Sequence, residues 1–394
     1  MVIRWGLRAH MNHTAGTIAT VFHDFPLGGS ERIAIRLMNR WAEMGRKVVI
    51  FAGALRGPLV DMIGRNVDVI ECAPVIPRGF GSRRKLGQAL ARYVAKNHVD
   101  TLFVPGNFHW PALPGLAAVP KEQRPSIIAQ ISTPLYRHGR GPVQQVAYNM
   151  LTRYRLSCAD AAISLAPSVI TEADKILGRR ITQCIRLPAL DDAAEMLPQA
   201  DGKLIVVAGR LVKEKGFDVA LKAFARVADK GTKLAILGEG PERAALTALA
   251  TSLGVAERVQ FVGYVPDIMP WLAQARVFLL SSYYEGYGAV IVEALAAGRP
   301  VVSTNCGPAS SELLRTLDGC AVAPIGDHVG LGDALNRVLA TPAPHPQMLA
   351  DAVAGYRIGP IAEKYLTVFD RVHAHKWGLA PEAAEHFAKE MAYV

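Results

Sequence analysis

The feature that most constrains this chain is an alternation of short apolar runs with longer helical patterns, which occurs twice along its 394 residues. Such an alternation is typical of α/β units built around a parallel sheet. The first series of expected strands is Thr17–Phe22, Val48–Ala52, Val67–Glu71, Thr101–Val104, Ile127–Ile131 and Ala161–Ser164. The second series is Leu204–Ala208, Leu234–Leu237, Val259–Val262, Val277–Leu280 and Val301–Ser303. The pattern predicts two doubly wound α/β domains with a ligand cleft at the carboxyl ends of their strands.

The expected domain boundaries follow from this pattern and from local composition. The stretch from Leu187 to Gly202 contains two prolines and four acidic residues, which is typical of an interdomain linker. An amphipathic helix is expected near the end of the chain, at Pro360–Lys376. The predicted parts are a basic tail (1–16), a first domain (17–187), a linker (188–202), a second domain (203–358) and a late helix with its tail (359–394).

Charge is divided unevenly between the two halves. The chain has a net charge of +10, yet residues 1–187 carry 25 Lys and Arg against 11 Asp and Glu. The first half therefore has a net charge of +14 and the remainder −4. A basic surface of this kind favours an anionic partner: nucleic acid, an acidic membrane surface or a phosphorylated substrate.

Cysteine usage and hydropathy indicate the compartment. The five cysteines have scattered spacings and no CxxC pair, so we interpret them as reduced thiols without a metal. The N-terminus lacks the apolar run of a secretory signal, and no 18 consecutive residues are apolar. We therefore expect a cytoplasmic protein that can touch a membrane.

The most informative segment is Ser281–Gly298, which reads SSYYEGYGAVIVEALAAG. A strand ends there and a helix begins near Ala289, so the backbone N–H groups of the loop and of the helix N-terminus favour an anion. A carboxylate at Glu285 is useful beside that anion if it contacts sugar hydroxyls and favours positive charge at an anomeric carbon. Glu293 is able to accept hydrogen bonds from a ribose diol. The alternative is a structural joint with two solvated glutamates.

A second segment, Gly209–Gly216, follows the first strand of the second half. Arg210 and Lys215 are suited to a diphosphate, the first as a planar fork and the second as a point charge. Many enzymes hold such a leaving group with a metal on an Asp-x-Asp pair, and this chain contains no such pair. Two protein cations are the natural substitute, and an ordinary loop with solvated charges is the alternative.

Two glycine-containing turns complete the set of phosphate-site candidates. Gly28 and Gly29 precede a helix that we expect Ser30 to cap, and they would let a phosphate approach the backbone closely. A tight structural turn explains this glycine pair equally well. The turn Gly238–Pro241 lacks the third glycine of a dinucleotide fingerprint, which argues against a dehydrogenase.

Four ordered motifs, GRLVKEKG, LGEGPER, FVGYVPD and EGYGAVIVEALAAGRPVVS, resemble the donor domain of the retaining family 4 glycosyltransferases. The resemblance is strong over residues 202–314 and extends moderately to the GGSE segment at Gly28–Glu31. It implies a GT-B fold of two Rossmann-like, doubly wound parallel-sheet domains. A nucleotide sugar would occupy the interdomain cleft, and the acceptor would bind the N-terminal domain. The late helix would cross back to that domain.

The resemblance also implies roles for individual residues. Arg210 and Lys215 would bind the diphosphate and, with Glu285, act in catalysis, while Glu285 binds the sugar hydroxyls and Glu293 the ribose. The remaining donor-binding residues would be Gly28, Gly29, Gly238, Glu239, Tyr264, Tyr287, Gly288, Ala289 and Val290. The donor would be linked to UDP or GDP, no metal cofactor would be needed, and the anomeric configuration would be retained.

The acceptor side departs from the family pattern. Many relatives carry a histidine after the fifth strand, where this chain reads Ile128 to Pro134 without one. His138 and His109 are the candidates to replace it, and the acceptor-side candidates as a whole are His109, Ser132, His138 and Arg140. For each histidine, the alternative is a surface or packing role. The Asn-Pro that the family places between its domains is Leu187-Pro188 here.

The surplus of basic residues in the first half suggests a membrane. An apolar stripe with Val143, Val146, Met150 and Tyr154 is flanked by arginines. Such a stripe is usually core, but with flanking arginines it is also suited to an anionic bilayer. The N-terminal domain is thus hypothesised to dock on the inner leaflet, where a lipid-linked, phosphate-bearing acceptor is presented.

The leading hypothesis is a metal-independent retaining glycosyltransferase that builds a bacterial surface glycan on a lipid-linked or glycan acceptor. A second is another GT-B activity, either a nucleotide-sugar epimerase or a phosphorolytic enzyme. A third is a catalytically silent scaffold that binds membrane or nucleic acid. Nucleic-acid binding is disfavoured because only 7% of the residues are aromatic and none interleave with the arginine clusters.

Overall fold

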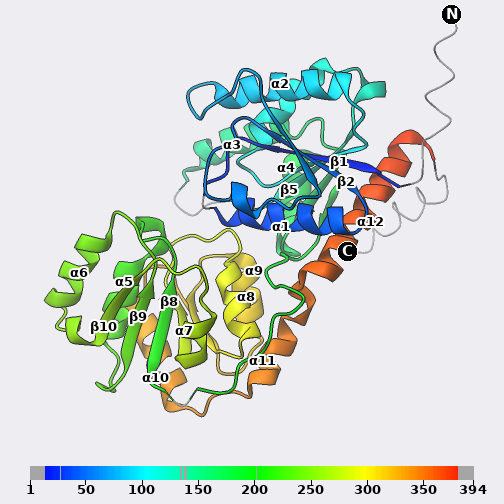
Figure 1. Ribbon diagram of the computed structural model, residues 1–394. Helices are drawn as coiled ribbons and strands as arrows, with labels where there is room; N and C mark the ends of the chain where they lie inside the picture. The colour runs from blue at the N-terminus through cyan, green and yellow to red at the C-terminus, as the bar shows by residue number, and fades with distance from the viewer. Residues whose placement is uncertain (1–13, 27, 134, 137–139, 201, 380–394) are drawn as a thin grey trace, which may run out of the picture. The chain divides into compact units, whose positions relative to one another are not determined.

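The computed structural model describes residues 14–26, 28–133, 135–136, 140–200 and 202–379. The chain divides into two compact units (Figure 1). The N-terminal unit consists of the chain up to Pro188 together with the segment that starts at Ile358. The C-terminal unit is Ala189–Arg357. The N-terminal unit is therefore assembled from two segments that lie far apart in the sequence.

The N-terminal unit contains a parallel sheet of seven strands in the order β3-β2-β1-β4-β5-β6-β7. The strands are β1 (Thr17–Phe22), β2 (Lys47–Ala52), β3 (Val67–Glu71), β4 (Thr101–Val104), β5 (Ser126–Ile131), β6 (Ala161–Ser164) and β7 (Thr182–Cys184). The central strands are buried along almost their whole length, which explains why they read as continuous apolar runs. The order reverses direction between β1 and β4, and ligands bind beside such a switch point in open α/β sheets.

Helices cover both faces of this sheet. In Figure 1, α1 and α12 lie on one face and α2, α3 and α4 on the other. Their bounds are α1 (Gly29–Glu43), α2 (Ser82–Lys96), α3 (Pro142–Arg155), α4 (Ser168–Leu177) and α12 (Ile358–Trp377). Three short 3₁₀ helices complete the unit: η1 (Val60–Met62), η2 (Trp110–Ala118) and η3 (Lys121–Gln123).

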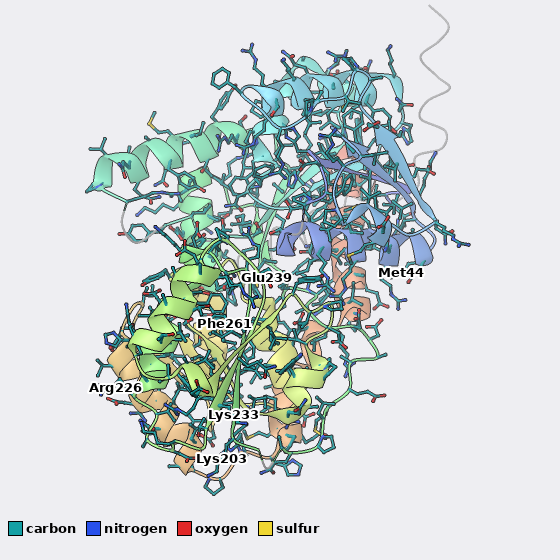
Figure 2. The ribbon with its side chains drawn as sticks, turned by 60° about the vertical axis from the view of Figure 1, so that its left-hand side comes forward. Met44, Lys203, Arg226, Lys233, Glu239 and Phe261 are labelled. Carbon is teal, nitrogen blue, oxygen red and sulfur yellow. The ribbon has the colours of Figure 1, made fainter. Side chains whose placement is uncertain are left out.

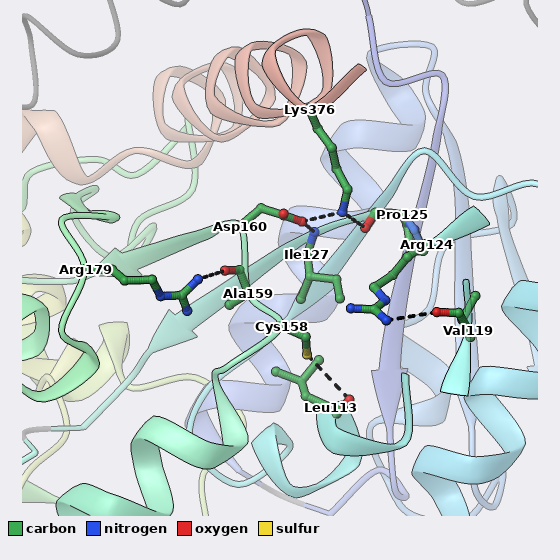
Figure 3. Close-up of polar contacts among 10 residues, drawn as sticks. All are labelled: Leu113, Val119, Arg124, Pro125, Ile127, Cys158, Ala159, Asp160, Arg179 and Lys376. Atoms are coloured by element: carbon green, nitrogen blue, oxygen red, sulfur yellow. Dashed lines mark hydrogen bonds and ion pairs between the residues drawn. The ribbon is translucent and has the colours of Figure 1, made fainter. Parts of the chain in front are cut away.

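Helix α12 is anchored in the N-terminal unit by apolar packing and by an ion pair. The Trp41 ring lies 5.0 Å from that of Phe369, and its indole N–H donates to the Ala362 carbonyl at 3.2 Å. At the other end of the helix, the Lys376 ammonium contacts Asp160 at 2.7 Å and donates to the Pro125 carbonyl at 2.8 Å (Figure 3). The late amphipathic helix expected at Pro360–Lys376 is thus confirmed.

The C-terminal unit contains a parallel sheet of six strands in the order β10-β9-β8-β11-β12-β13. The strands are β8 (Leu204–Ala208), β9 (Lys233–Leu237), β10 (Val259–Gly263), β11 (Ala275–Leu280), β12 (Val301–Thr304) and β13 (Ala321–Ala323). Its switch point lies between β8 and β11. One buried apolar cluster joins these strands to the helices α5 and α10.

The helices of the C-terminal unit surround its sheet. Their bounds are α5 (Phe217–Ala225), α6 (Arg243–Ser252), α7 (Met269–Gln274), α8 (Ala289–Ala296), α9 (Pro308–Arg315), α10 (His328–Ala340) and α11 (Pro346–Ala352). The 3₁₀ helices are η4 (Lys213–Lys215), η5 (Ala256–Arg258) and η6 (Ala354–Tyr356). Helices α1 and α8 each end before a glycine with positive φ, at Gly45 (φ 87°) and Gly298 (φ 74°), a conformation that glycine adopts readily at helix ends.

The stretch expected to link the domains lies against the C-terminal unit. Its Leu190 forms a β-bridge with Arg357, and its Pro198 carbonyl accepts a hydrogen bond from the buried Arg299. The structure contains free thiols at all five cysteines. Among the residues that it describes, no helix combines the length and the apolar character needed to cross a bilayer.

The apolar stripe on α3 is exposed, so its interpretation as core is wrong. The exposed fraction is 82% for Val143, 58% for Val146, 70% for Met150 and 62% for Tyr154. Thr152, on the opposite side of the helix, is the buried residue of α3. The helix therefore packs on the unit through its polar face, where Thr152 is buried and Gln145 and Tyr148 are half-buried, and it presents its apolar face outward.

Candidate functional site

Three loops of the C-terminal unit meet at the carboxyl end of its sheet. They follow β8, β9 and β11, and β8 and β11 are the strands on either side of the switch point. Figure 2 shows the direction of the strands: Lys203 and Lys233 lie at one end of the sheet, and Glu239 lies at the opposite end. The sequence motifs at Gly209–Gly216, Leu237–Arg243 and Glu285–Ser303 all contribute residues to this end.

Backbone hydrogen bonds join the three loops. The Leu211 N–H donates to the Glu239 carbonyl at 2.9 Å, and the Tyr283 N–H donates to the Glu214 carbonyl at 2.9 Å. A further bond runs from the Ser281 hydroxyl to the Lys215 carbonyl at 3.2 Å. The loops are thus held as one group of interlocked turns.

Glycines are required where these loops cross. Gly216 has φ +58°, and a Cβ there would lie 2.2 Å from the Ser281 carbonyl oxygen. A Cβ on Gly238, where φ is +141°, would lie 1.9 Å from the Gly209 carbonyl oxygen. Both distances are shorter than any van der Waals contact, and both involve backbone atoms that have little room to move. The glycines of the motifs therefore serve the close packing of the loops.

The central polar contact of the site joins Lys215 to Glu285. The Lys215 ammonium lies 2.6 Å from Oε1 of Glu285, and the Ser282 hydroxyl donates to the same oxygen at 2.7 Å. Glu285 is only 8% exposed, and its own N–H donates to the Cys306 carbonyl at 3.0 Å. Both side-chain bonds go to Oε1, so Oε2 accepts no hydrogen bond from the residues that the structure describes. A paired carboxylate at this depth is consistent with the cost of burying an isolated charge.

This carboxylate affects a neighbouring thiol. Burial, together with the negative charge of Glu285, raises the pKa of Cys306 to about 11. Cys306 is therefore a protonated thiol near neutral pH and acts as a packing residue rather than a nucleophile.

Arg210 provides a second cation at the same end of the sheet. It is exposed and makes no ion pair or side-chain hydrogen bond within the described part of the chain. A Cβ on the adjacent Gly209 would lie 3.7 Å from Cδ of Lys215, so the stem of that lysine lies beside the backbone preceding Arg210. One cation that is paired and another that is unpaired are thus placed together.

The remaining predicted donor residues of this unit lie on these loops, directly after β10 and in α8. Glu239 forms an ion pair with Arg243 at 2.5 Å, and Tyr264 is 63% exposed. Tyr287 is 8% exposed, and its ring lies 6.2 Å from that of Tyr356. Gly288 caps α8 with φ +72°, Ala289 and Val290 form the first turn of that helix, and Glu293 lies half-buried in it. The N-terminus of α8 is thus placed beside Glu285, as the sequence predicts.

Gly28 and Gly29 lie in the N-terminal unit at the start of α1. Gly28 is the N-cap residue, with φ −126° and no side-chain cap, and Gly29 is the first residue of the helix. The expectation that Ser30 caps this helix is wrong, because Ser30 lies inside its first turn. A Cβ on Gly29 would meet nothing within 4 Å, so this turn does not need its second glycine for packing.

The acceptor-side candidates that the structure describes lie on the segments that follow the neighbouring strands β4 and β5. His109 is 4% exposed, and its Nδ1 lies 3.0 Å from the Pro105 carbonyl, to which it must donate. Burial lowers the pKa of His109 to about 4, so the ring is neutral near pH 7. Ser132 takes part in hydrogen bonds with Asn107, the shorter of which, from its backbone N–H, measures 2.9 Å.

Arg140 contacts an aromatic ring and a backbone carbonyl. Its guanidinium lies 3.8 Å from the ring centroid of Tyr148 and donates to the Leu135 carbonyl at 3.1 Å. His138 lies outside the described residues.

The sequence did not point to Ser282 or to the direct contact of Lys215 with Glu285. Ser282 lies three positions before Glu285, and the spacing by itself gives no reason to prefer it over Ser281. The lysine and the glutamate are 70 positions apart, so only the adjacency of β8 and β11 brings them together.

Comparison with known proteins gives a family match over the segment that contains these loops. Residues 202–341 match the family model of glycosyl transferases group 1. The matched domain lies within the C-terminal unit. The resemblance seen in the four motifs is thus confirmed. This domain is similar to the lipopolysaccharide core biosynthesis glycosyltransferase LpsE of Rhizobium meliloti, with 40% identity over 150 residues, which is 38% of this chain and 43% of that protein. The chain spans about half the length of the curated relatives that it matches.

Solved structures resemble the chain over most of its length. The apo form of the lipopolysaccharide outer core galactosyltransferase WaaB has a TM-score of 0.69 at 14% identity, covering 89% of this chain and 98% of that one. Anabaena HepE in complex with UDP and glucose has a TM-score of 0.68 at 18% identity, covering 92% and 100%. At this level of identity the similarity shows the fold, which is the GT-B fold of two Rossmann-like domains, as expected.

Proposed function

We propose that this protein is a metal-independent, retaining glycosyltransferase that moves a sugar from a UDP- or GDP-linked donor to a lipid-linked or glycan acceptor in bacterial surface glycan synthesis. The observation that carries the proposal is the Lys215–Glu285 pair beside the unpartnered Arg210. The family match and the relative described as a lipopolysaccharide core glycosyltransferase support this class of reaction.

The proposed donor complex uses the two cations for the diphosphate. Arg210 has no ion pair to give up among the described residues, and Lys215 has two further ammonium protons besides the one facing Glu285. A leaving nucleoside diphosphate gains negative charge as the glycosidic bond breaks, and these cations stabilise it as a metal would elsewhere. The structure of HepE was solved with UDP and glucose, which supports a nucleotide-sugar donor for this fold.

Glu285 has a separate role in the proposal. Its Oε1 is held by Lys215 and Ser282, while Oε2 remains available to accept a hydrogen bond from a sugar hydroxyl. The negative charge then lies close to the anomeric carbon, which becomes positive in the transition state. Ser282 fixes the rotamer of the carboxylate, so it is a positioning residue.

Alanine variants of the pair test the proposal. Lys215→Ala and Glu285→Ala should each lower kcat by about 100-fold or more, because each removes a charge that stabilises the transition state. The matched controls are Lys213→Ala and Glu214→Ala, which remove the same charges from exposed positions of η4. Near-wild-type transfer by Lys215→Ala or Glu285→Ala, with a donor identified by a thermal-shift panel of UDP, GDP and ADP sugars, would refute the assignment.

Metal independence and stereochemistry need measurements of their own. Transfer should be unchanged in EDTA, and ¹H NMR of the first product formed should show the anomeric configuration of the donor. Loss of transfer in EDTA that returns on adding Mg²⁺, or an inverted product, contradicts that part of the proposal. Epimerised donor formed without an acceptor, or release of sugar phosphate, would instead indicate an epimerase or a phosphorolytic enzyme.

The proposal includes peripheral attachment to the anionic inner leaflet through α3. At 3.6 residues per turn, the exposed apolar side chains Val143, Val146, Met150, Leu151 and Tyr154 lie within an arc of about 140°. Arg153 and Arg155 flank the two edges of that arc. This arrangement matches an interfacial helix, in which each basic residue near the lipid surface adds about 1 kcal/mol.

Vesicle flotation tests the attachment. The wild-type protein should float with vesicles that contain phosphatidylglycerol, and the double variant Val146→Glu/Met150→Glu should remain in the dense fraction. Val329→Glu is the control, because Val329 is likewise an exposed apolar residue on a helix, α10, with an exposed fraction of 41%. Equal flotation of the double variant and the control would refute the role of α3.

A further inference from the structure

A charged cavity lies in the N-terminal unit, at the carboxyl ends of β1, β3 and β4. It has a volume of about 420 Å³. It is lined by His23, Arg78, Gly79, Phe80, Gly81, Ser82, Arg83 and Phe108. His23 follows β1 and Phe108 follows β4, so the cavity borders the switch point of its sheet, where open α/β sheets bind ligands.

The cavity holds a buried histidine without hydrogen-bond partners. His23 is 1% exposed, and neither Nδ1 nor Nε2 has a partner among the described residues. A neutral imidazole carries one N–H and one lone pair, and both are normally satisfied when the ring is buried. The unmet donor of His23 is therefore suited to an oxygen acceptor that a ligand brings into the cavity.

Three basic residues lie at the N-terminus of α2, where the helix dipole disfavours positive charge. The first turn of α2 contains Arg83, Arg84 and Lys85 and no acidic residue. The N-terminus of a helix is its positive end, where cations are unfavourable and anions are stabilised. None of the three forms an ion pair within the described part of the chain. An anion bound at this end would offset the repulsion among the cations and the repulsion between the cations and the helix N-terminus.

The surroundings hold two of the arginines in place. The guanidinium groups of Arg78 and Arg83 lie 4.5 Å and 4.2 Å from the ring centroid of Phe108. Asp24 accepts two hydrogen bonds from Nε of Arg78, at 2.6 Å and 2.7 Å, and neutralises that residue. Asp24 thus pairs with Arg78 alone, and Arg83 is oriented by the Phe108 ring without an ion pair among the described residues.

The loop adds an apolar element. Phe80 lies between two glycines and is fully exposed, at the rim of the cavity. Aromatic rings at such places contact the organic part of a ligand while polar groups bind its charge. This favours a phosphate ester over a bare inorganic ion as the natural ligand.

We propose that this cavity binds the phosphate group of a phosphorylated acceptor, with Arg83 and the N-terminus of α2 as its main contacts and His23 as a further donor. That the phosphate belongs to an acceptor rests on the proposed function, whereas the binding of a phosphate ester does not. The acceptor would then be recognised by its charge as well as by its sugar. The phosphate is carried either by a sugar or by a lipid headgroup.

Titration with inorganic phosphate and glucose 6-phosphate tests the site without any donor. Arg83→Gln should weaken both by about 10-fold or more, because a charge-assisted contact is lost. Arg92→Gln, which removes the same charge further along α2, should change the affinity less than 2-fold. In ¹⁵N NMR spectra, the ring signals of His23 should shift on adding phosphate. Equal losses in the two variants, or an unchanged His23 signal, would overturn the proposal.

Competition identifies the source of the phosphate. Displacement of bound glucose 6-phosphate by phosphatidylglycerol vesicles, in the Val146→Glu/Met150→Glu background, would support the site and assign it to a lipid headgroup. Lack of displacement by these vesicles, with binding of glucose 6-phosphate intact, would support the site and assign it to a sugar phosphate. If no nucleotide sugar supports transfer, the proposed function fails, and the phosphate titration still decides the cavity.

Discussion

The motif loops of the C-terminal unit and the turns that begin α1 and α2 in the N-terminal unit differ in how closely their glycines are packed. In the C-terminal unit, Gly216 and Gly238 are crowded by backbone oxygens, and a Cβ there would lie 2.2 Å and 1.9 Å from them. In the N-terminal unit, a Cβ on Gly29, Gly79 or Gly81 would meet nothing within 4 Å. Gly216 and Gly238 of the C-terminal unit are therefore needed for packing, whereas Gly29, Gly79 and Gly81 of the N-terminal unit lie in open space.

Charge follows the same division. The C-terminal loops pair Lys215 with Glu285 and Arg243 with Glu239. The start of α2 in the N-terminal unit gathers cations that lack such partners. The C-terminal loops thus hold their central charges paired and their crossing glycines packed, although Arg210 remains exposed, and the start of α2 has neither kind of constraint. The motif loops are thus fixed by their own packing, whereas the ligand binding that we propose for the N-terminal cavity would use a turn that packing constrains less.

The largest expected effect on stability distinguishes crowded from open glycines. Gly216→Ala should lower the free energy of unfolding by about 3 kcal/mol or more, since it combines a left-handed backbone with a backbone clash. Gly81→Ala, with φ +71° and open space, should cost only about 1 kcal/mol. Urea unfolding curves measure both. Equal costs would show that the two sets of loops do not differ in packing.

A pH-dependent effect of similar size is expected in the N-terminal unit. The pKa of His109 is about 4 in the folded protein, because the ring is buried. It is about 6.5 in an unfolded chain. Between these values the unfolded state binds more protons, so the free energy of unfolding falls as the pH drops from about 6.5 to 4, by about 3 kcal/mol in all.

His109→Gln should flatten this part of the pH profile, as followed by urea unfolding at several pH values. His328→Gln, at an exposed position in the C-terminal unit, should leave the slope unchanged. A variant of His109 that keeps the wild-type slope would mean that other groups cause the loss of stability in acid.

The smallest effect concerns the cations of α2. Arg84→Glu should raise the free energy of unfolding by about 0.5 to 1 kcal/mol at low salt, because it replaces a cation with an anion at the positive end of the helix. Arg92→Glu, away from that end, should not stabilise the protein. The gain should shrink at 1 M NaCl. Destabilisation by Arg84→Glu at low salt would show that the helix start is not under charge repulsion.

Much of the fold could be predicted from the sequence, because buried parallel strands produce continuous apolar runs. Each expected strand is present within a residue or two of its predicted bounds. Two further strands were not predicted, β7 and β13, which lie at sheet edges, contain three residues each and are only partly buried. Runs this short carry no clear period.

The site was predictable only in part. The residues of the C-terminal loops could be named from their motifs, since the motifs are continuous segments. The charged cavity of the N-terminal unit could not be predicted, because His23, Arg83 and Phe108 come from three separate segments that only the strand order brings together. Periodicity on α3 revealed an apolar stripe but not whether it faces the core, because burial depends on the neighbours of the helix.

The discontinuous N-terminal unit has a consequence for synthesis on the ribosome. Trp41 packs against Tyr365 and Phe369 of α12. One side of the core of this unit therefore stays exposed to solvent until α12 is translated. The C-terminal unit is one continuous segment, Ala189–Arg357, and is complete before α12 is made. The half of the protein that is translated first is therefore the half that matures last, and its basic, partly open surface is available to chaperones throughout.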